Sequence, residues 1–579
     1  MSYDGHDVLL RSSGVVSDES DLWCTYAAVR TLTWLGRLGR LESPQAVAGF
    51  LTSRQNSEGG YAWSAGMNSD AWATYYCTQT LKDLGLDGGP LAGRPTAEWV
   101  AATQHQDGGY AMTSGQASDV WATYYAVRTL VEIHGLQPPG TLFAWLGQLQ
   151  AEDGGLSWSP SHAKSHQADV RACYYAVNAW STATGGQGPL PWDRERLTSW
   201  LKARQSNAGG FTFQDGDRTD CLWATFRATR VLQQLGEAPA DRDGCVAWTR
   251  ARLQPGGSFT RWPGYPVQDV WAAFCAVGAL TALGDDVIDI ADQVTEAVLS
   301  FRTAQGGFTY REPAAASDAL TTAACLLSGA PSPDQADRLN RWLEACMLPN
   351  EDGIMYMPGR GSEVRCTLWA LAAGAYVSDR AALSRISAWL CNSLQNPDGG
   401  FGYWEGRASD IVSTCAAVEI LHLTEGDAAT RGLAGIAAFV ASCEVMPGAY
   451  ANVPGGKPGL RATLQALRAL RRTDRADIGA VRDALVRHRV RGGGFANESS
   501  RLPDLLSTYE AVLAADTFGL ETETEHLARF MRSVRTDSGG FAWTPLMQGS
   551  GGPLADCLGR QLDIRLTSEH VALPTLVIS

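Results

Sequence analysis

The sequence has no surplus of positive charge. It holds 47 Lys and Arg against 61 Asp and Glu, a formal net charge of −14. Nucleic-acid binding depends on a basic surface, so this balance argues against DNA or RNA as a partner. Long apolar runs are also missing, and no stretch reaches the ~20 residues of a transmembrane helix. The composition, with 45% hydrophobic residues, predicts a globular protein without a membrane span.

Signs of export and of disulfide bonding are lacking as well. The first residues have neither the basic nor the apolar segment of a signal peptide. Thirteen cysteines is an odd number, and none of them form a Cys-x-x-Cys pair. Many of them fall in segments with helical periodicity, where buried free thiols are ordinary. We therefore expect reduced thiols and a cytoplasmic location.

What the sequence has in abundance is one repeated stretch. Its clearest copies run from Gln55 to Leu81 and from Gln104 to Leu130. Each has an apolar segment with helical spacing, a Gly-Gly pair with an aromatic residue, a polar loop, and a second apolar segment that opens with Asp. Glycines permit a chain reversal, and a carboxylate suits the N-terminus of a helix. Each copy is thus predicted to be a helical hairpin.

The starts of the second helices give the number of hairpins. We place these starts at Asp21, Asp70, Asp119, Asp169, Cys221, Asp269, Asp318, Glu363, Asp410, Gly459, Asp504 and Glu569. Such a hairpin cannot bury its apolar face alone, so the units must stack or close on one another. Twelve hairpins predict an all-α fold of two α6/α6 barrels in tandem, at residues 1–290 and 291–579. An open solenoid is the alternative, but no terminal unit looks like a polar cap.

The motif Gln-x-x-x-Gly-Gly-(Phe/Tyr)-x-Trp, as in Gln55 to Trp63, resembles the repeat of the class II terpene cyclase and squalene–hopene cyclase family. The likeness covers nearly the whole chain. Protein prenyltransferase β-subunits have a similar repeat, but a single ring. The resemblance implies an enzyme that cyclises or rearranges a polyprenyl diphosphate in an aromatic-lined cavity. Prenyl transfer to an acceptor, and non-catalytic binding of a lipid or peptide, are the alternatives.

The family's catalytic acid lies in an Asp-x-Asp-Asp-Thr-Ala stretch, and its best match here begins at Asp318. Leu320 and Thr321 stand where the family has its second and third Asp, so the motif is not intact. We take Asp318 as the candidate acid, followed by Asp410 and Asp504 in the same half. For each of them, helix capping is the competing interpretation.

Two residues after each helix start, Trp is the most frequent residue, as in Trp72 and Trp121. Three repeats have arginine at this position instead, namely Arg171, Arg365 and Arg461. A guanidinium group matches phosphate oxygens, which suggests that these arginines hold a diphosphate. The alternative is an ion pair with a neighbouring carboxylate.

Aromatic faces stabilise carbocations, so Trp72, Trp121 and Tyr124 are candidates for the wall of a substrate cavity. Core packing explains these three residues equally well.

An acidic loop precedes the second helix of the fifth hairpin and contains Asp215, Asp217 and Asp220. Mg²⁺ favours a few carboxylates together with water, so this loop is a candidate to hold Mg²⁺ with a diphosphate, and a solvated loop is the alternative. The zinc ligands of the prenyltransferases have no counterpart. The corresponding helices read Ser413-Thr-Cys415 and Ser507-Thr-Tyr509, so no zinc is expected. The sequence does not predict an oligomeric state.

Overall fold

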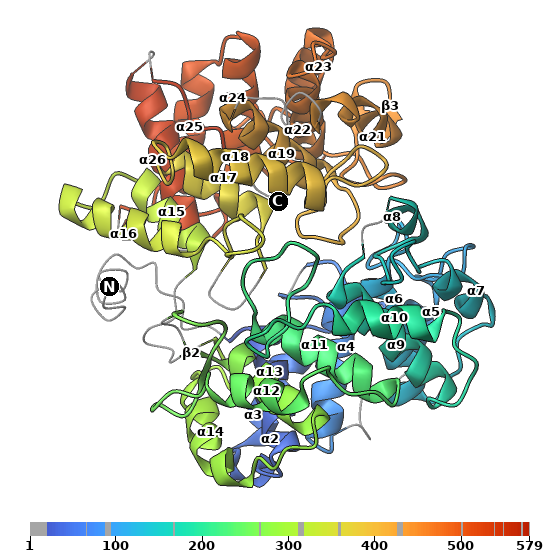
Figure 1. The fold of residues 1–579 in the computed structure, drawn as a ribbon. Helices are drawn as coiled ribbons and strands as arrows, with labels where there is room; N and C mark the ends of the chain where they lie inside the picture. Colours follow the sequence, from blue (N-terminus) through green and yellow to red (C-terminus); the bar gives the residue numbers. More distant parts are fainter. Residues whose placement is uncertain are drawn as a thin grey trace. The chain divides into compact units, whose positions relative to one another are not determined.

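The structure of the chain is a computed structural model (Figure 1). The structure describes residues 20–64, 67–86, 94–165, 168–265, 268–310, 318–356, 361–424, 432–498, 502–537, 539–547, 549–568 and 571–577. The chain divides into two compact units, Asp18–Ala316 and Ser317–Ser579, which we call the first and the second barrel. In the described ranges, no helix has both the length and the apolar character to cross a bilayer.

The first barrel is a closed double ring of helices. Its inner ring consists of α2 (Leu22–Trp34), α4 (Ala71–Asp83), α6 (Val120–Arg128) with the π-helical turn η3 (Thr129–Ile133), α9 (Val170–Thr184), α11 (Leu222–Gln234) and α13 (Val270–Ala282). Each of these helices packs against the next, and α13 packs against α2. The outer helices are α3 (Pro44–Thr52), α5 (Arg94–Ala101), α7 (Thr141–Gly147), α10 (Arg194–Lys202), α12 (Arg242–Arg250) and α14 (Ile288–Ser300). Short pieces join them, namely η1 (Leu38–Arg40), α8 (Pro160–Lys164) and the paired strands β1 (Phe259–Thr260) and β2 (Gln268–Asp269).

The second barrel repeats this plan. Its inner ring consists of α15 (Ala319–Leu327), α17 (Val364–Ala372), α19 (Ile411–Thr424), α22 (Leu460–Arg471), α24 (Leu505–Phe518) and α26 (Pro553–Thr567). Neighbours in this order pack together, and α15 packs against α26. Outside them lie α16 (Pro333–Ala345), α18 (Arg380–Trp389) with η5 (Leu390–Leu394), α21 (Ile436–Ser442), α23 (Ile478–His488) and α25 (Thr524–Val534), with the strands β3 (Glu444–Met446) and β4 (Ala449–Tyr450). The predicted all-α fold of two barrels is confirmed.

The inner helices begin where the repeated Asp predicts. Asp119 is extended (φ −138°), and its carboxylate accepts the N–H of Ala122 at the start of α6. This bond satisfies one of the N–H groups that the first turn of a helix leaves without a partner. Eleven predicted starts coincide with inner-helix starts. The twelfth prediction was wrong: α26 begins at Pro553, after Gly552, whereas Glu569 lies outside the described residues.

The Gly-Gly pair is required by close packing, as the second repeat shows. Gly108 has φ +101°, and a Cβ there would collide with the carbonyl oxygen of Thr141 on α7. A Cβ on Gly109 would lie 2.5 Å from the Trp145 ring of the same outer helix. The next residue, Tyr110, donates its N–H to the Thr123 hydroxyl (3.0 Å). The spacing of Gly, Gly, aromatic residue and Thr therefore fixes the turn between an outer and an inner helix.

The first barrel closes by joining its last turn to its first helix. Phe308, which follows α14, donates its N–H to the Thr25 hydroxyl on α2 (3.0 Å), and the Asp21 N–H donates to the Phe308 carbonyl (2.8 Å). These are the contacts that Tyr110 makes with the helix that directly follows it in the chain. The turn after α14 is thus hydrogen-bonded to the start of α2, so α14 belongs to the first barrel. The expected boundary at 290/291 falls inside α14, whereas the two units divide at 316/317.

Aromatic side chains fill the end of the first ring where its inner helices begin. The Trp23 ring stacks on Trp223 at a centroid distance of 5.9 Å, and meets Trp72 and Trp271 edge-on at 5.2 and 5.0 Å. A layer of Tyr and Phe follows, in which Tyr26 and Tyr76 stack at 4.1 Å. Edge-to-face and offset contacts of this kind add to the energy of burial. The first barrel is therefore solid at this end.

Candidate functional site

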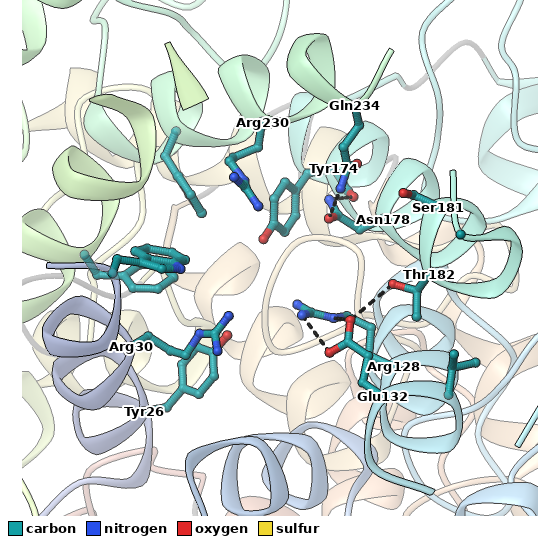
Figure 2. Close-up of a pocket in the computed structure, with 15 residues that line it drawn as sticks. Tyr26, Arg30, Arg128, Glu132, Tyr174, Asn178, Ser181, Thr182, Arg230 and Gln234 are labelled. Carbon is teal, nitrogen blue, oxygen red and sulfur yellow. Dashed lines mark hydrogen bonds and ion pairs between the residues drawn. The ribbon is translucent and has the colours of Figure 1, made fainter. Parts of the chain in front are cut away.

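A pocket of about 380 Å³ lies beyond the aromatic layers, near the C-terminal ends of the inner helices of the first barrel (Figure 2). It is lined by Tyr26, Arg30, Trp34, Arg128, Val131, Glu132, Tyr174, Asn178, Ser181, Thr182, Gly185, Phe226, Arg230, Gln234 and Phe274. Its volume is near the low end of the ~300–1,000 Å³ typical of small-molecule pockets. It therefore suits a small ligand.

Three arginines reach this pocket from three inner helices. Arg30 lies on α2, Arg128 on α6 and Arg230 on α11. Each of them follows the N-cap residue of its helix by nine positions (21 to 30, 119 to 128, 221 to 230). The repeat thus brings them to one level of the ring, and Figure 2 shows the three side chains around the same hollow.

Two of these arginines are balanced by carboxylates, and the third adds a positive charge. Arg128 donates to both oxygens of Glu132 (2.8 Å each), and Arg30 donates to both oxygens of Asp83 (2.7 and 2.9 Å). Arg230 donates to the neutral side chain of Gln233 (3.0 Å) and makes no ion pair with any described residue. Three cations against two anions leave one positive charge, which favours an anionic ligand.

Orphaned polar atoms support the same conclusion. The Nε–H of Arg30 and the Oε1 atom of Gln234 are buried and have no hydrogen-bond partner among the described residues. Buried polar groups are nearly always paired in native proteins, so such atoms call for an explanation. A bound ligand with an acceptor for Arg30 would provide a partner.

The pocket lining keeps its carboxylate ionised and its phenols protonated. Burial opposes the ionisation of Glu132, but the charge and hydrogen bonds of Arg128 outweigh it and keep the pKa of Glu132 below its usual value. Burial raises the pKa of Tyr26 and of Tyr174, so both phenols stay protonated at neutral pH. Among its lining residues, the pocket therefore offers positive charge and aromatic surface, but no neutral carboxylic acid.

The wall of the pocket is aromatic on the side of the ring interior. Tyr26, Phe226 and Phe274 are largely buried, and the Phe226 ring meets Phe274 edge-on at 5.1 Å. Trp34 stacks on Phe274 at 4.8 Å. Such faces accommodate an apolar chain and stabilise a positive charge near it. The pocket thus combines an anion-binding rim with an aromatic floor.

The predicted acids occupy helix starts in the second barrel. Asp318 caps α15 and accepts the N–H and the hydroxyl of Thr321 (2.8 and 2.6 Å). Asp410 accepts both groups of Ser413 at 2.8 Å, and Asp504 accepts those of Ser507 at 2.8 and 2.7 Å.

The environment of Asp410 shifts its pKa in the direction that a catalytic acid needs. Burial raises the pKa of Asp410, although the hydrogen bonds from Ser413 oppose the shift. A raised pKa favours the protonated form, which is the form that a general acid needs. Capping by Asp318, Asp410 and Asp504 is observed, and their role as acids remains a prediction.

Two of the arginines predicted to bind diphosphate pair with the carboxylate two residues earlier. Arg171 contacts Asp169 (2.7 Å) and lies over the Phe213 ring, and Arg365 contacts Glu363 (2.7 Å). The third, Arg461, follows Gly459 and forms no ion pair with any described residue; its backbone N–H donates to the Asn497 side chain (3.0 Å). None of the three lines the pocket of the first barrel.

None of the three predicted aromatic residues lines the pocket. Trp72 and Trp121 pack against each other at 4.9 Å in the solid end of the ring and do not line the pocket. Tyr124 accepts a hydrogen bond from Arg128 (2.6 Å) through its hydroxyl. It therefore supports a pocket residue from behind.

The three loop carboxylates do not converge. Asp215 is almost fully exposed and lies 3.4 Å from Arg204. Asp217 turns inward and accepts the N–H groups of Phe213 and Gln214 (2.9 and 3.0 Å), and Asp220 accepts the Ser206 hydroxyl.

Across the described residues, no three His, Cys, Asp or Glu side chains are grouped as a metal site requires. Asp215, Asp217 and Asp220 therefore do not fit Mg²⁺ in this structure.

Sequence reasoning missed the arginines of the pocket because it compared the repeats only near their helix starts. The signal lies nine residues further on, where the first six repeats read Arg30, Gln79, Arg128, Asn178, Arg230 and Gly278. Five polar side chains at one position of otherwise apolar helices are unusual for a core. A comparison of every column would have found this position.

Comparisons with known proteins place this architecture. The family model of the prenyltransferase alpha-alpha toroid domain matches residues 9–95, 65–188, 186–353, 318–470 and 460–572, which together cover most of the chain. The chain therefore belongs to the prenyltransferase alpha-alpha toroid family. The comparison with curated proteins found no match.

Several solved structures are similar at low identity. The ent-copalyl diphosphate synthase of Streptomyces platensis is 13% identical over 97% of this chain and 99% of that one, with a TM-score of 0.34. The type II terpene cyclase MstE of Scytonema is 15% identical over 50% of this chain and 97% of that one (TM-score 0.35). A protein from Actinoplanes is 19% identical over 50% and 100%, also with a TM-score of 0.35. At these scores, the likeness says nothing about the activity of this chain.

Proposed function

We propose that this protein is an isoprenoid-processing enzyme, of terpene cyclase-like type, that binds a prenyl diphosphate in the first-barrel pocket. The observation that carries this proposal is the placement of Arg30, Arg128 and Arg230 above an aromatic floor. A diphosphate carries several negative charges, and its prenyl chain is apolar and branched. The rim and the floor of the pocket match these two parts of one ligand.

The same groups suit a reaction that begins with loss of the diphosphate. The bond between the allylic carbon and oxygen breaks, and both electrons leave with the diphosphate, next to the arginines that stabilise its charge. The allylic cation then lies against Tyr26, Phe226 and Phe274, and their faces stabilise it while the chain rearranges or cyclises. Loss of a proton gives a hydrocarbon. Capture of the cation by an acceptor would instead give prenyl transfer.

A second candidate reaction is cyclisation that starts with protonation of an alkene in the second barrel. The raised pKa of Asp410 favours it, since a buried protonated carboxyl group can donate its proton. The diphosphate would then remain on the product. Asp318 is the first Asp of the incomplete family motif and the leading candidate from the sequence, so both residues belong in the test.

The test of ligand binding is titration calorimetry with geranyl and farnesyl diphosphate. Arg230→Gln removes the arginine that has no ion pair among the described residues, and we expect roughly tenfold weaker binding, because a charge-assisted hydrogen bond is lost. Arg40→Gln is the matched control. It also removes one positive charge, but Arg40 pairs with Glu296 on the outside of the same barrel. Equal effects of the two variants would contradict a site at Arg230.

The test of the reaction is product analysis after incubation with the same diphosphates, with and without Mg²⁺. Release of diphosphate with a hydrocarbon supports ionisation in the first barrel, and a prenylated acceptor supports transfer. A cyclic diphosphate that disappears in Asp410→Asn or Asp318→Asn would support protonation in the second barrel. Tight binding with no product under any condition would identify a carrier and not an enzyme.

A further inference from the structure

The second barrel holds its own C-terminal segment inside its ring. Leu576 and Val577 are buried to 0% and 1% exposure, and Leu573 is also buried. Val577 packs in the same apolar cluster as Leu368 of α17 and Leu464 of α22. Residues 571–577, which we call the tail, thus contribute branched aliphatic side chains to the interior of this barrel.

Three inner helices bind the tail through its carbonyl groups. The Tyr509 hydroxyl of α24 donates to the Pro574 carbonyl (2.7 Å), and the Trp369 indole N–H of α17 donates to that of Val577 (3.2 Å). The Arg468 guanidinium of α22 donates to the Leu576 carbonyl (3.5 Å). In the ring order, α17 and α24 stand opposite each other. The tail therefore crosses the interior of the ring.

This position corresponds to the pocket of the first barrel. Arg468 follows the N-cap residue Gly459 by nine positions, as Arg30, Arg128 and Arg230 follow theirs. In the first barrel this level of the ring is a pocket, and in the second barrel the tail fills it.

The contacts of the tail are those of a ligand and not of a structural element. Among the described residues, no backbone amide of 572–577 donates a hydrogen bond. The tail is held by burial of aliphatic side chains and by side-chain donors to its carbonyl oxygens. A strand or helix built into the barrel would also have its amide groups paired.

The polar end of this interior has a donor to spare. Arg468 is fully buried and pairs with Glu510 (2.7 Å) and Glu419 (3.4 Å), yet its Nε–H has no acceptor within the described residues. Arg472 pairs with Glu419 as well (2.9 Å), so the four charges cancel. A neutral ligand with an oxygen acceptor fits such a site better than an anion does.

We propose that the interior of the second barrel is a binding site for a branched aliphatic chain that ends in a neutral oxygen acceptor, of the class of prenyl alcohols, and that the tail blocks it until displaced. Leu573, Leu576 and Val577 stand in for the branched chain. The carbonyl groups stand in for the oxygen that Tyr509, Trp369 and Arg468 bind. This site does not depend on the first-barrel pocket.

The experiment displaces the tail in the full-length chain and measures farnesol binding by calorimetry. The double variant Leu576→Asp, Val577→Asp places two carboxylates in an apolar site and should release the tail. We expect at least tenfold tighter farnesol binding than in the unmodified chain, with competition by a synthetic peptide of residues 571–579. Val571→Asp is the matched control, because Val571 is exposed, and it should bind farnesol as the unmodified chain does.

Three results would overturn the proposal. These are unchanged farnesol affinity in a folded double variant, binding that the peptide does not reduce, and a double variant that fails to fold, since the tail would then be part of the core. Tyr509→Phe, added to the double variant, removes one proposed donor to the ligand oxygen and keeps the ring; a few-fold loss of farnesol affinity relative to the double variant is expected, and unchanged affinity would show that Tyr509 does not bind the ligand.

Arg230→Gln is also introduced into each of these variants. Farnesyl diphosphate is then titrated into them in parallel with farnesol. If these variants lose farnesyl diphosphate binding but keep the gain in farnesol affinity, the second-barrel site is supported. The two proposals are then tested independently of each other.

Discussion

The position of an arginine along its helix decides what it does in this chain. Near the helix start, Arg171 and Arg365 reach back to the carboxylate that caps their own helix, which is two residues away. Near the helix end no cap carboxylate is within reach, so Arg230 projects into a pocket. The residue type is the same, and the distance to the cap accounts for the difference.

Glu132 competes with a ligand for Arg128. We predict that Glu132→Gln strengthens binding of farnesyl diphosphate a few-fold, because Arg128 is freed, and lowers stability by about 1–3 kcal/mol through the lost charge-assisted bonds. Calorimetry and thermal unfolding measure the two effects. The folded pKa of Glu132 is lowered, so its contribution to stability is present above the unfolded pKa of about 4.3 and is lost as pH falls through the folded value. Weaker binding in the variant would show that Glu132 itself holds the ligand.

Asp217 should destabilise the folded chain at neutral pH. Burial raises its pKa to about 6, so the folded state favours the protonated form. The stability it contributes is complete below the unfolded pKa of about 3.9 and is lost as pH rises through about 6. We predict that Asp217→Asn is more stable than the unmodified chain at pH 7.5, by on the order of 2 kcal/mol, with little difference at pH 4. Urea unfolding at both pH values measures this. A gain of the same size at both would rule out titration as the cause.

At the scale of the hairpin, the turn carries the repeat. Its first glycine needs positive φ, its second lies under the Trp of an outer helix, and the next N–H bonds to a Thr of an inner helix. These requirements explain why Gly-Gly, Trp and Thr recur at fixed intervals while the loops between them vary. The turn therefore sets the relative placement of the inner and the outer helix.

Gly109→Ala should destabilise the first barrel strongly. The new Cβ would lie 2.5 Å from Trp145 and 2.9 Å from Ser118, so the outer helix must move. Overpacking of a well-filled core costs about 1–3 kcal/mol, and thermal unfolding should show a lower midpoint. Gly39→Ala is the matched control, because no atom lies within 4 Å of a Cβ there. A neutral Gly109→Ala would mean that α7 can shift freely.

At the scale of the whole molecule, each barrel is a ring and not a stack. In the first barrel, α13 packs against α2, and the turn after α14 bonds to α2. In the second barrel, α26 packs against α15. Contacts between the two ends of each barrel replace the polar caps that open repeat proteins need.

A closed ring should unfold as one unit. We predict that Trp23→Ala, in α2, speeds amide hydrogen exchange in all inner helices of the first barrel, including α9 on the opposite side of the ring. Removal of a buried Trp costs about 3–5 kcal/mol, and a cooperative ring spreads this cost over all its members. Exchange followed by mass spectrometry tests it. Faster exchange confined to α2 and its two neighbours would instead indicate the local behaviour of an open stack.

The sequence predicted the class of fold and the helix starts because both are local. A cap Asp, a Gly-Gly turn and helical periodicity act within one hairpin, and twelve copies leave few ways to bury the apolar faces. For Arg171, the sequence also suggested an ion pair with a neighbouring carboxylate, and the structure shows this pair with Asp169. The last helix start was missed because α26 is capped by Gly552, and not by the repeated Asp.

The sequence by itself determined the hairpin, its repetition and the family to which the chain belongs, since each depends on residues close together in the chain. Only the tertiary structure decided which residues share the ring interior. Closure of the ring brings Arg30, Arg128 and Arg230 to one pocket and pairs α14 with α2, and it places the tail beside Arg468. These contacts join residues that are many helices apart, so they exist only once the ring has closed.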